Sequence, residues 1–169
     1  MVIFLAHCIL NQNSRASGIA KRRGPIREVL EVLLHHGVGI VQMPCPELLY
    51  LGPDRPTHDK EWYDREDFRE LCRKLAEDVA TLLEMYLKGG YKVLGIVGIE
   101  HSPSCAVESI SLIIQGEKTY VEGKGIFMEE LSKTLTSKGL TDIPLKGFLI
   151  DEEGIRDICN WLKNQIEKE

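Results

Sequence analysis

The sequence lacks the long apolar run that a membrane-spanning helix needs. Residues 2–10 form an apolar stretch that His7 interrupts, and it has only about half of the roughly 20 residues required to cross a bilayer. The sequence also lacks a basic segment followed by an apolar stretch and a small-residue cleavage site, which is the pattern of a secretory leader. We therefore expect a cytoplasmic protein that does not contact a membrane.

The sequence has no excess of positive charge. Its 21 Lys and Arg residues face 26 Asp and Glu residues, which gives a net charge of −5. A chain of this sign has no overall electrostatic attraction to nucleic acid. Apolar residues make up 43% and charged residues 28%, a globular composition that excludes disordered and collagen-like chains. We expect residues 1–169 to form a single α/β domain around one core.

The five cysteines are an odd number and include no Cys-x-x-Cys pair. Neither a fully paired disulfide framework nor a zinc finger of common spacing is therefore indicated. Cys72 and Cys159 fall on the apolar stripes of predicted helices, where a free cysteine packs as a small apolar residue. The remaining three, Cys8, Cys45 and Cys105, are the candidates for metal binding or catalysis.

Short apolar runs predict four buried strands, at residues 2–6, 38–43, 93–99 and 145–150. Apolar residues at helical spacing predict helices at residues 26–34, 68–86, 127–135 and 155–166. Because helical crossovers cover both faces of a parallel sheet, this alternation predicts a three-layer α/β/α fold. We expect a mostly parallel, flavodoxin-like or Rossmann-like sheet. Residues 52–64 and 109–124 interrupt the alternation, and we expect both segments to lie over the site. Residues 109–124 could form a short hairpin or an extra edge strand.

The three candidate cysteines follow three different predicted strands. Cys8 follows the first strand, Cys45 the second and Cys105 the third. Ligands of open parallel sheets bind at the carboxyl ends of the strands, so we expect the three thiols at one edge of the sheet. Three thiolates suit an iron-sulfur cluster with one iron that no protein group binds. With His7 or His101 as a fourth ligand, the same thiolates suit a zinc site.

The cysteine motifs resemble those of the thiouracil desulfurase family, formerly a domain of unknown function, in order and spacing. They are Ala6-His-Cys-Ile-Leu10, Met43-Pro-Cys-Pro-Glu47 and Ser102-Pro-Ser-Cys105. The resemblance covers residues 1–105 and extends through Gly123-Lys-Gly125 toward residue 150. It implies a 4Fe-4S cluster held by Cys8, Cys45 and Cys105 and non-redox carbon-sulfur cleavage of a thiolated nucleobase, nucleoside or related thio-compound. It also implies that Glu47 and Ser102 assist proton movement as catalytic residues.

The sequence departs from the family pattern beside two of the cysteines. Cys8 precedes Ile-Leu-Asn11 where the family tends to have Leu-Leu-Gly, and His101 and Ala106 flank the third motif. We expect four polar residues to line the substrate pocket: Asn11, Asn13, His101 and Ser104. The substrate stays open among free thiouracil, a thiolated nucleoside in RNA, which would connect the protein to tRNA thiolation, and another thiolated metabolite.

A compact basic segment consists of Lys21, Arg22 and Arg23 and is a candidate contact for RNA or a phosphate group. Two other functions stay open for the cysteine site. One is a zinc or other metal-binding module without catalysis. The other is a hydrolase or transferase that uses one cysteine as nucleophile and His7 or His101 as its base. No heptad pattern indicates an oligomeric state.

Overall fold

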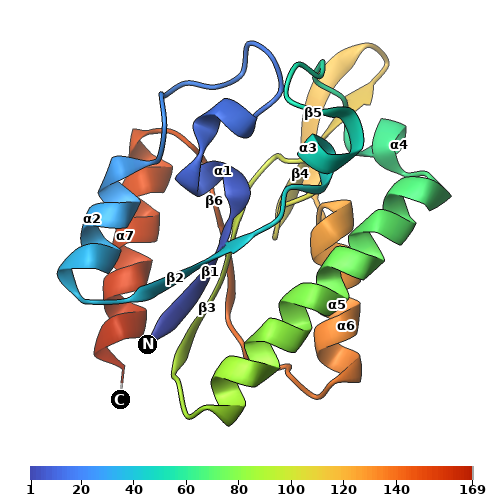
Figure 1. The fold of residues 1–169 in the computed structure, drawn as a ribbon. Helices are drawn as coiled ribbons and strands as arrows, with labels where there is room; N and C mark the ends of the chain where they lie inside the picture. The colour runs from blue at the N-terminus through green and yellow to red at the C-terminus, as the bar shows by residue number, and fades with distance from the viewer. Residues whose placement is uncertain (169) are drawn as a thin grey trace.

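The computed structural model describes residues 1–168, in which four strands form one parallel sheet (Figure 1). The strands are β1 (Val2–Ala6), β2 (Gly39–Met43), β3 (Val93–Ile99) and β6 (Leu145–Phe148). They lie in the order β2-β1-β3-β6, and each pairs with its neighbours in parallel. This is the order of flavodoxin-like sheets. The predicted parallel α/β fold is confirmed.

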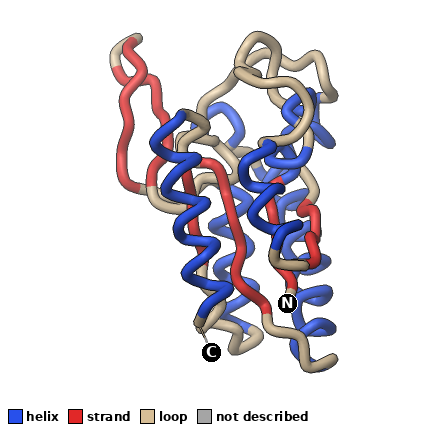
Figure 2. The backbone as a smooth tube through the Cα atoms, turned by 90° about the vertical axis from the view of Figure 1, so that its left-hand side faces the viewer, coloured by secondary structure: helices blue, strands red, loops and turns tan. Residues whose placement is uncertain are grey.

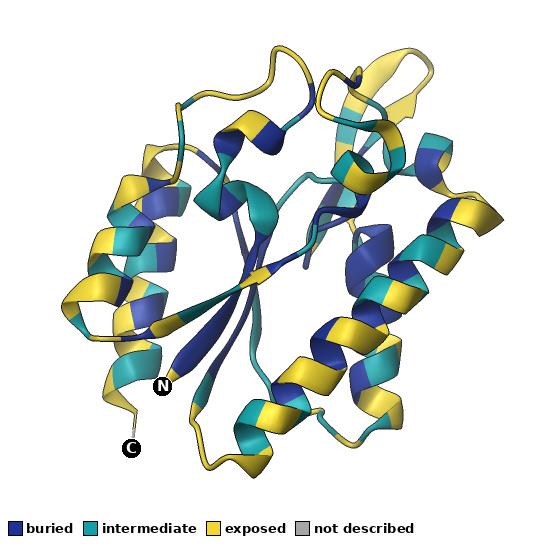
Figure 3. Cartoon of the chain, in the orientation of Figure 1, coloured by how far each residue is buried: buried dark blue, intermediate teal, exposed yellow. Residues whose placement is uncertain are grey.

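Helices cover both faces of the sheet, as Figure 1 shows. On one face, α2 (Arg27–His35) packs against α7 (Glu152–Glu167). On the other face, α5 (Glu66–Lys88) packs against α6 (Ile126–Ser137). The buried stripe of each helix faces the sheet and the exposed stripe faces outward (Figure 3). The predicted three layers are therefore present.

The central strand β1 shows why the sheet could be predicted. All five of its residues are buried, because helices cover it on both sides. Local signals also place the helix starts: Asp151 begins α7 with a side-chain hydrogen bond from the Gly154 amide at 2.8 Å. Within residues 1–168, no helix has the length and apolar character to span a bilayer.

Short elements gather at the carboxyl ends of the strands. They are α1 (His7–Leu10), the 3-10 turn η1 (Gln12–Ser14), α3 (Pro46–Leu51) and α4 (Lys60–Tyr63). An antiparallel hairpin of β4 (Ser109–Ile114) and β5 (Glu117–Glu122) rises beyond the same end of the sheet (Figure 2). The hairpin is a separate two-stranded sheet, so of the two forms expected for this segment the structure has the hairpin.

Candidate functional site

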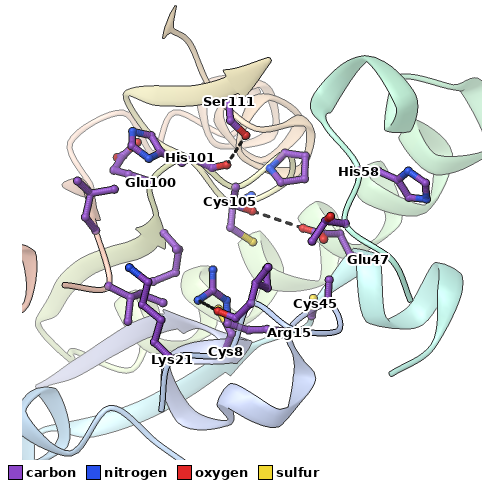
Figure 4. A pocket seen from close by; sticks show the side chains of 18 of the residues that line it. Cys8, Arg15, Lys21, Cys45, Glu47, His58, Glu100, His101, Cys105 and Ser111 are labelled. Atoms are coloured by element: carbon purple, nitrogen blue, oxygen red, sulfur yellow. Dashed lines mark hydrogen bonds between the residues drawn. The ribbon is translucent and has the colours of Figure 1, made fainter. Parts of the chain in front are cut away.

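The carboxyl ends of β1, β2 and β3 meet at a cavity of about 610 Å³. Cys8 in α1, Cys45 before α3 and Cys105 after β3 all line it (Figure 4). The three thiols predicted to meet do lie around one space. Cys72 is buried on α5 and Cys159 is half-buried on α7, and both pack in the core as predicted.

The turn after β3 holds Cys105 in place. The Ser102 hydroxyl oxygen accepts a hydrogen bond from the Cys105 amide at 3.0 Å, and the Cys105 carbonyl accepts one from the Ile99 amide at 3.1 Å. A Cβ atom at Gly98 would lie 2.1 Å from that carbonyl oxygen, so this strand position has to be glycine. The position of the Cys105 thiol is therefore set by close backbone packing.

The polar side chains after Cys8 form hydrogen bonds with the backbone of their own turn. Gln12 Nε2 donates to the Cys8 carbonyl at 2.6 Å, and Asn11 Oδ1 accepts from the Asn13 amide at 3.1 Å. Asn13 itself is exposed. Neither asparagine lines the cavity, in contrast to the expectation, because Asn11 caps the 3-10 turn and Asn13 faces solvent.

Burial raises the pKa of all three thiols. The pKa of Cys8 rises to about 12 through burial and the neighbouring Cys45, and the pKa of Cys45 rises to about 11 through burial and the Glu47 carboxylate. Burial and the two other thiols raise the pKa of Cys105 well above its usual value. A nucleophilic cysteine needs a lowered pKa, so this environment disfavours the hydrolase or transferase interpretation. Ligation of a metal deprotonates such thiols outright.

Glu47 lies next to Ser102 and Ser104, the two serines of the third cysteine motif. Its Oε1 accepts a hydrogen bond from Ser104 Oγ at 2.5 Å and a longer one from Ser102 Oγ at 3.4 Å. Ser102 lines the cavity. Ser104 does not line it, in contrast to the expectation, because the residue is 1% exposed and its hydroxyl is directed at Glu47. The carboxylate is thus held against both serines of the third cysteine motif.

Arg55, which no motif in the sequence indicates, lies on the other side of Glu47. Its Nε is 3.6 Å from Glu47 Oε2, and its side chain is 3% exposed. The available signal was an arginine between Pro53 and Pro56 in the segment expected to lie over the site.

Three rings that line the cavity, those of His58, His101 and Tyr120, take part in stacking. His101 stacks on Tyr120 of the hairpin with ring centroids 3.8 Å apart, and His58 stacks on Trp62 with centroids 3.6 Å apart. His101 has a positive φ of 66°, and its carbonyl accepts a hydrogen bond from Ser111 Oγ (Figure 4). His101 therefore lines the pocket as expected, with its ring held flat against Tyr120.

The three cysteines are the thiolate donors that a zinc ion or an iron-sulfur cluster would use at this cavity. Zinc ligands with Zn–S bonds of about 2.3 Å bring their sulfurs to about 3.8 Å from one another. Within residues 1–168, no three or more His, Cys, Asp or Glu side chains are grouped closely enough to hold one metal ion. A four-iron cluster takes its thiolates from a wider perimeter than a single ion does. The thiols of Cys45 and Cys105 are buried and that of Cys8 is half-buried, and all three line the cavity of about 610 Å³. Three thiolates around one space fit a cluster that keeps one iron without a protein ligand.

The basic segment is divided between different environments. Lys21 lines the cavity. Arg22 Nη1 instead donates to both carboxylate oxygens of Glu28, at 2.6 and 2.8 Å, and Arg23 is exposed outside the lining. Of the three residues, only Lys21 reaches the site.

Fold and site together define a flavodoxin-like α/β protein with three cysteines around a cavity at the strand ends. Its structure is similar to that of the 4Fe-4S-dependent thiouracil desulfidase TudS, with a TM-score of 0.54 and 18% sequence identity. The likeness covers 96% of this chain and 97% of that chain, and it shows a shared fold.

In sequence, the chain is 41% identical over 132 residues to Uncharacterized protein MJ0003 of Methanocaldococcus jannaschii. The match covers 78% of this chain and 76% of that protein. The chain belongs to the same protein family as MJ0003. No family model matches it.

Proposed function

We propose that the protein is an iron-sulfur-dependent desulfurase that removes sulfur from a thiolated nucleobase, nucleoside or related thio-compound. Cys8, Cys45 and Cys105 hold a 4Fe-4S cluster in this proposal. The observation that carries it is that three cysteines, one from each of three strand ends, line one cavity together with Glu47. The fold shared with TudS over nearly the whole chain supports it. When bound, the cluster supplies an iron without a protein thiolate, which is a Lewis-acidic position for the sulfur of the substrate.

Glu47 is assigned the role of general base. The net reaction replaces a carbon-sulfur bond by a carbon-oxygen bond and consumes one water, so a proton must leave the attacking water oxygen. Glu47 is 13% exposed at its side chain, within reach of water, and its Oε1 is oriented by Ser104 Oγ at 2.5 Å. A carboxylate positioned in this way accepts that proton at Oε1 or Oε2. Ser102, on the cavity wall, is assigned to the passage of protons toward the departing sulfur.

The cavity wall suits a flat ring. His101 and Tyr120 line it as a stacked pair, and His58 lines it with its ring stacked on Trp62. These planar side chains favour a heterocycle over a flexible thiol. Lys21 on the rim adds a positive charge for an anionic group, such as the phosphate of a nucleotide or of RNA. The proposed partners are thus a small thiolated heterocycle and, through Lys21, a phosphate attached to it.

The test is a sulfide-release assay with the full chain reconstituted without oxygen. A thiolated pyrimidine base, its nucleoside and a phosphorylated form of the nucleoside are compared as substrates. The Glu47→Gln variant, loaded with the same amount of iron, is the control. The proposal predicts sulfide and the oxygenated base in equal amounts from the native chain and a large loss in the variant. If the cluster-loaded native chain released sulfide no faster than the variant, the protein would bind a cluster without this activity.

A further inference from the structure

Arg55 is a buried cation next to the cysteine site. The residue is 4% exposed and lies in the segment that joins α3 to α4. A guanidinium group stays charged at every accessible pH, so its burial costs free energy unless other groups pair with it. The groups that surround its nitrogens therefore indicate its role.

Each nitrogen of the Arg55 side chain faces a different group. Nη1 donates to the Gly52 carbonyl at 3.2 Å, within the same segment. Nη2 donates to Cys45 Sγ at 3.9 Å, and Nε lies 3.6 Å from Glu47 Oε2. Nε has no hydrogen-bond partner among the described residues, so it interacts with Glu47 as an ion pair. One guanidinium thus contacts a proposed cluster ligand and the proposed base.

The contacts of Arg55 complete a polar chain between two of the cysteines. At the other end, Ser104 Oγ is 2.5 Å from Glu47 Oε1 and 3.6 Å from Cys105 Sγ. The hydroxyl has one hydrogen, and the shorter contact with the carboxylate takes it. The chain then runs from Cys105 through Ser104, Glu47 and Arg55 to Cys45.

The backbone of Arg55 is fixed as firmly as its side chain. Its carbonyl accepts a hydrogen bond from the Ser17 amide at 2.9 Å, which ties the segment to the loop after η1. The hydrogen bond from Nη1 to the Gly52 carbonyl restrains the guanidinium group at the end of the side chain. A lysine has one nitrogen on a flexible stem and cannot make the two site contacts in this fixed geometry.

We propose that Arg55 is a positioning residue that orients Glu47 through Nε and tunes the bound cluster through its hydrogen bond to Cys45 Sγ. This inference rests on the proposed function. A positive charge and an N–H group at a ligand sulfur stabilise the more negative, reduced state of a cluster, so Arg55 raises its reduction potential. The ion pair keeps Glu47 Oε2 in place while Oε1 faces Ser104.

The test compares Arg55→Gln and Arg55→Lys with Arg156→Gln, which removes the same charge from an exposed position on α7. For each full chain, reconstituted without oxygen, we would measure iron content, the reduction potential, and kcat and KM with a thiolated base. Arg55→Gln is expected to keep its iron, to have a more negative potential and to lose about 10- to 100-fold in kcat, with little change in KM. Arg55→Lys is expected to shift the potential in the same direction by less, and Arg156→Gln to match the native chain.

The potential separates a positioning role from a merely structural one, since a packing defect does not by itself alter the charge at the cluster. If the two Arg55 variants had the potential of Arg156→Gln, the inference would be overturned. If Arg55→Gln failed to fold or to bind iron, Arg55→Lys would decide, with a more negative potential supporting the inference and a native one contradicting it. A native chain that binds no iron would instead overturn the proposed function.

Discussion

Ser104 Oγ lies 2.5 Å from Glu47 Oε1, whereas Ser102 Oγ lies 3.4 Å from the same oxygen. Ser102 Oγ also accepts hydrogen bonds from the Ser104 amide at 3.3 Å and the Cys105 amide at 3.0 Å. The two serines of one short motif therefore share the Glu47 carboxylate, but only Ser102 Oγ also accepts from backbone amides of the turn. Ser104 orients the carboxylate, and Ser102 organises the turn that carries Cys105.

Removal of the Ser104 hydroxyl should impair turnover without loss of the cluster. A hydrogen bond to a charged group contributes about 1.5–3 kcal/mol, so Ser104→Ala is expected to lower kcat about 10- to 100-fold. Glu47→Gln removes the base and is expected to lower kcat by about 10²–10⁴-fold. Sulfide release per bound cluster measures both effects. Native turnover in Ser104→Ala would contradict the assigned geometry.

Ser102→Ala should act mainly on the Cys105 turn. The variant loses the acceptor for two backbone amides, and we expect faster loss of iron under a chelator than in Ser104→Ala. The rate of absorbance loss after chelator addition measures this difference. A variant that retains iron as well as Ser104→Ala does would contradict this role in the turn and would leave Ser102 with the proton passage alone.

The metal-free thiols should react slowly with alkylating agents at neutral pH. With a pKa of about 11, the thiolate fraction of Cys45 at pH 7 is about a hundredfold lower than that of a thiol at the ordinary value of 9.0. The pKa of about 12 for Cys8 lowers its fraction further. The alkylation rate should therefore rise about tenfold per pH unit between pH 7 and 10, as read by mass spectrometry at each cysteine. Rapid alkylation of a single thiol at pH 7 would favour the nucleophile interpretation instead.

Gly98→Ala should destabilise the fold at the Cys105 turn. The added methyl group would meet the Cys105 carbonyl oxygen at 2.1 Å and two side chains at 3.0 Å, and overpacking of this kind costs about 1–3 kcal/mol. Gly39→Ala in β2 is the matched control, because its nearest neighbour is a Val2 methyl group at 3.2 Å. Urea unfolding of the metal-free chains measures both. Equal losses in the two variants would show that the approach to Cys105 carries no special cost.

The sheet could be predicted because burial on both faces produces continuous apolar runs, as at residues 2–6 and 93–99. The convergence of the three cysteines followed from the rule that parallel strands end at a common edge. Both predictions use patterns that are local in sequence. At residues 109–124 the sequence does not distinguish a hairpin from an extra edge strand, because both forms of pairing produce the same short-range pattern.

The finer arrangement of the site depends on contacts between distant segments. Arg55 contacts Cys45 and Glu47 because the loop that follows α3 folds back over them. A loop has no periodic sequence pattern from which this course could be predicted. Asn11 was expected in the pocket for its amide group, but that group satisfies the backbone of a 3-10 turn. The stronger bond of Ser104 to Glu47 depends on side-chain orientation that the motif alone does not specify.

The iron and sulfide content of protein reconstituted without oxygen tests the central claim most directly. The triple variant Cys8→Ser, Cys45→Ser, Cys105→Ser is compared with the double variant Cys72→Ser, Cys159→Ser, which changes the two cysteines packed in the core. The account predicts about four irons and four sulfides in the native chain and in the double variant, and none in the triple variant. A native chain without iron, or one that binds a single zinc ion in its place, would contradict it.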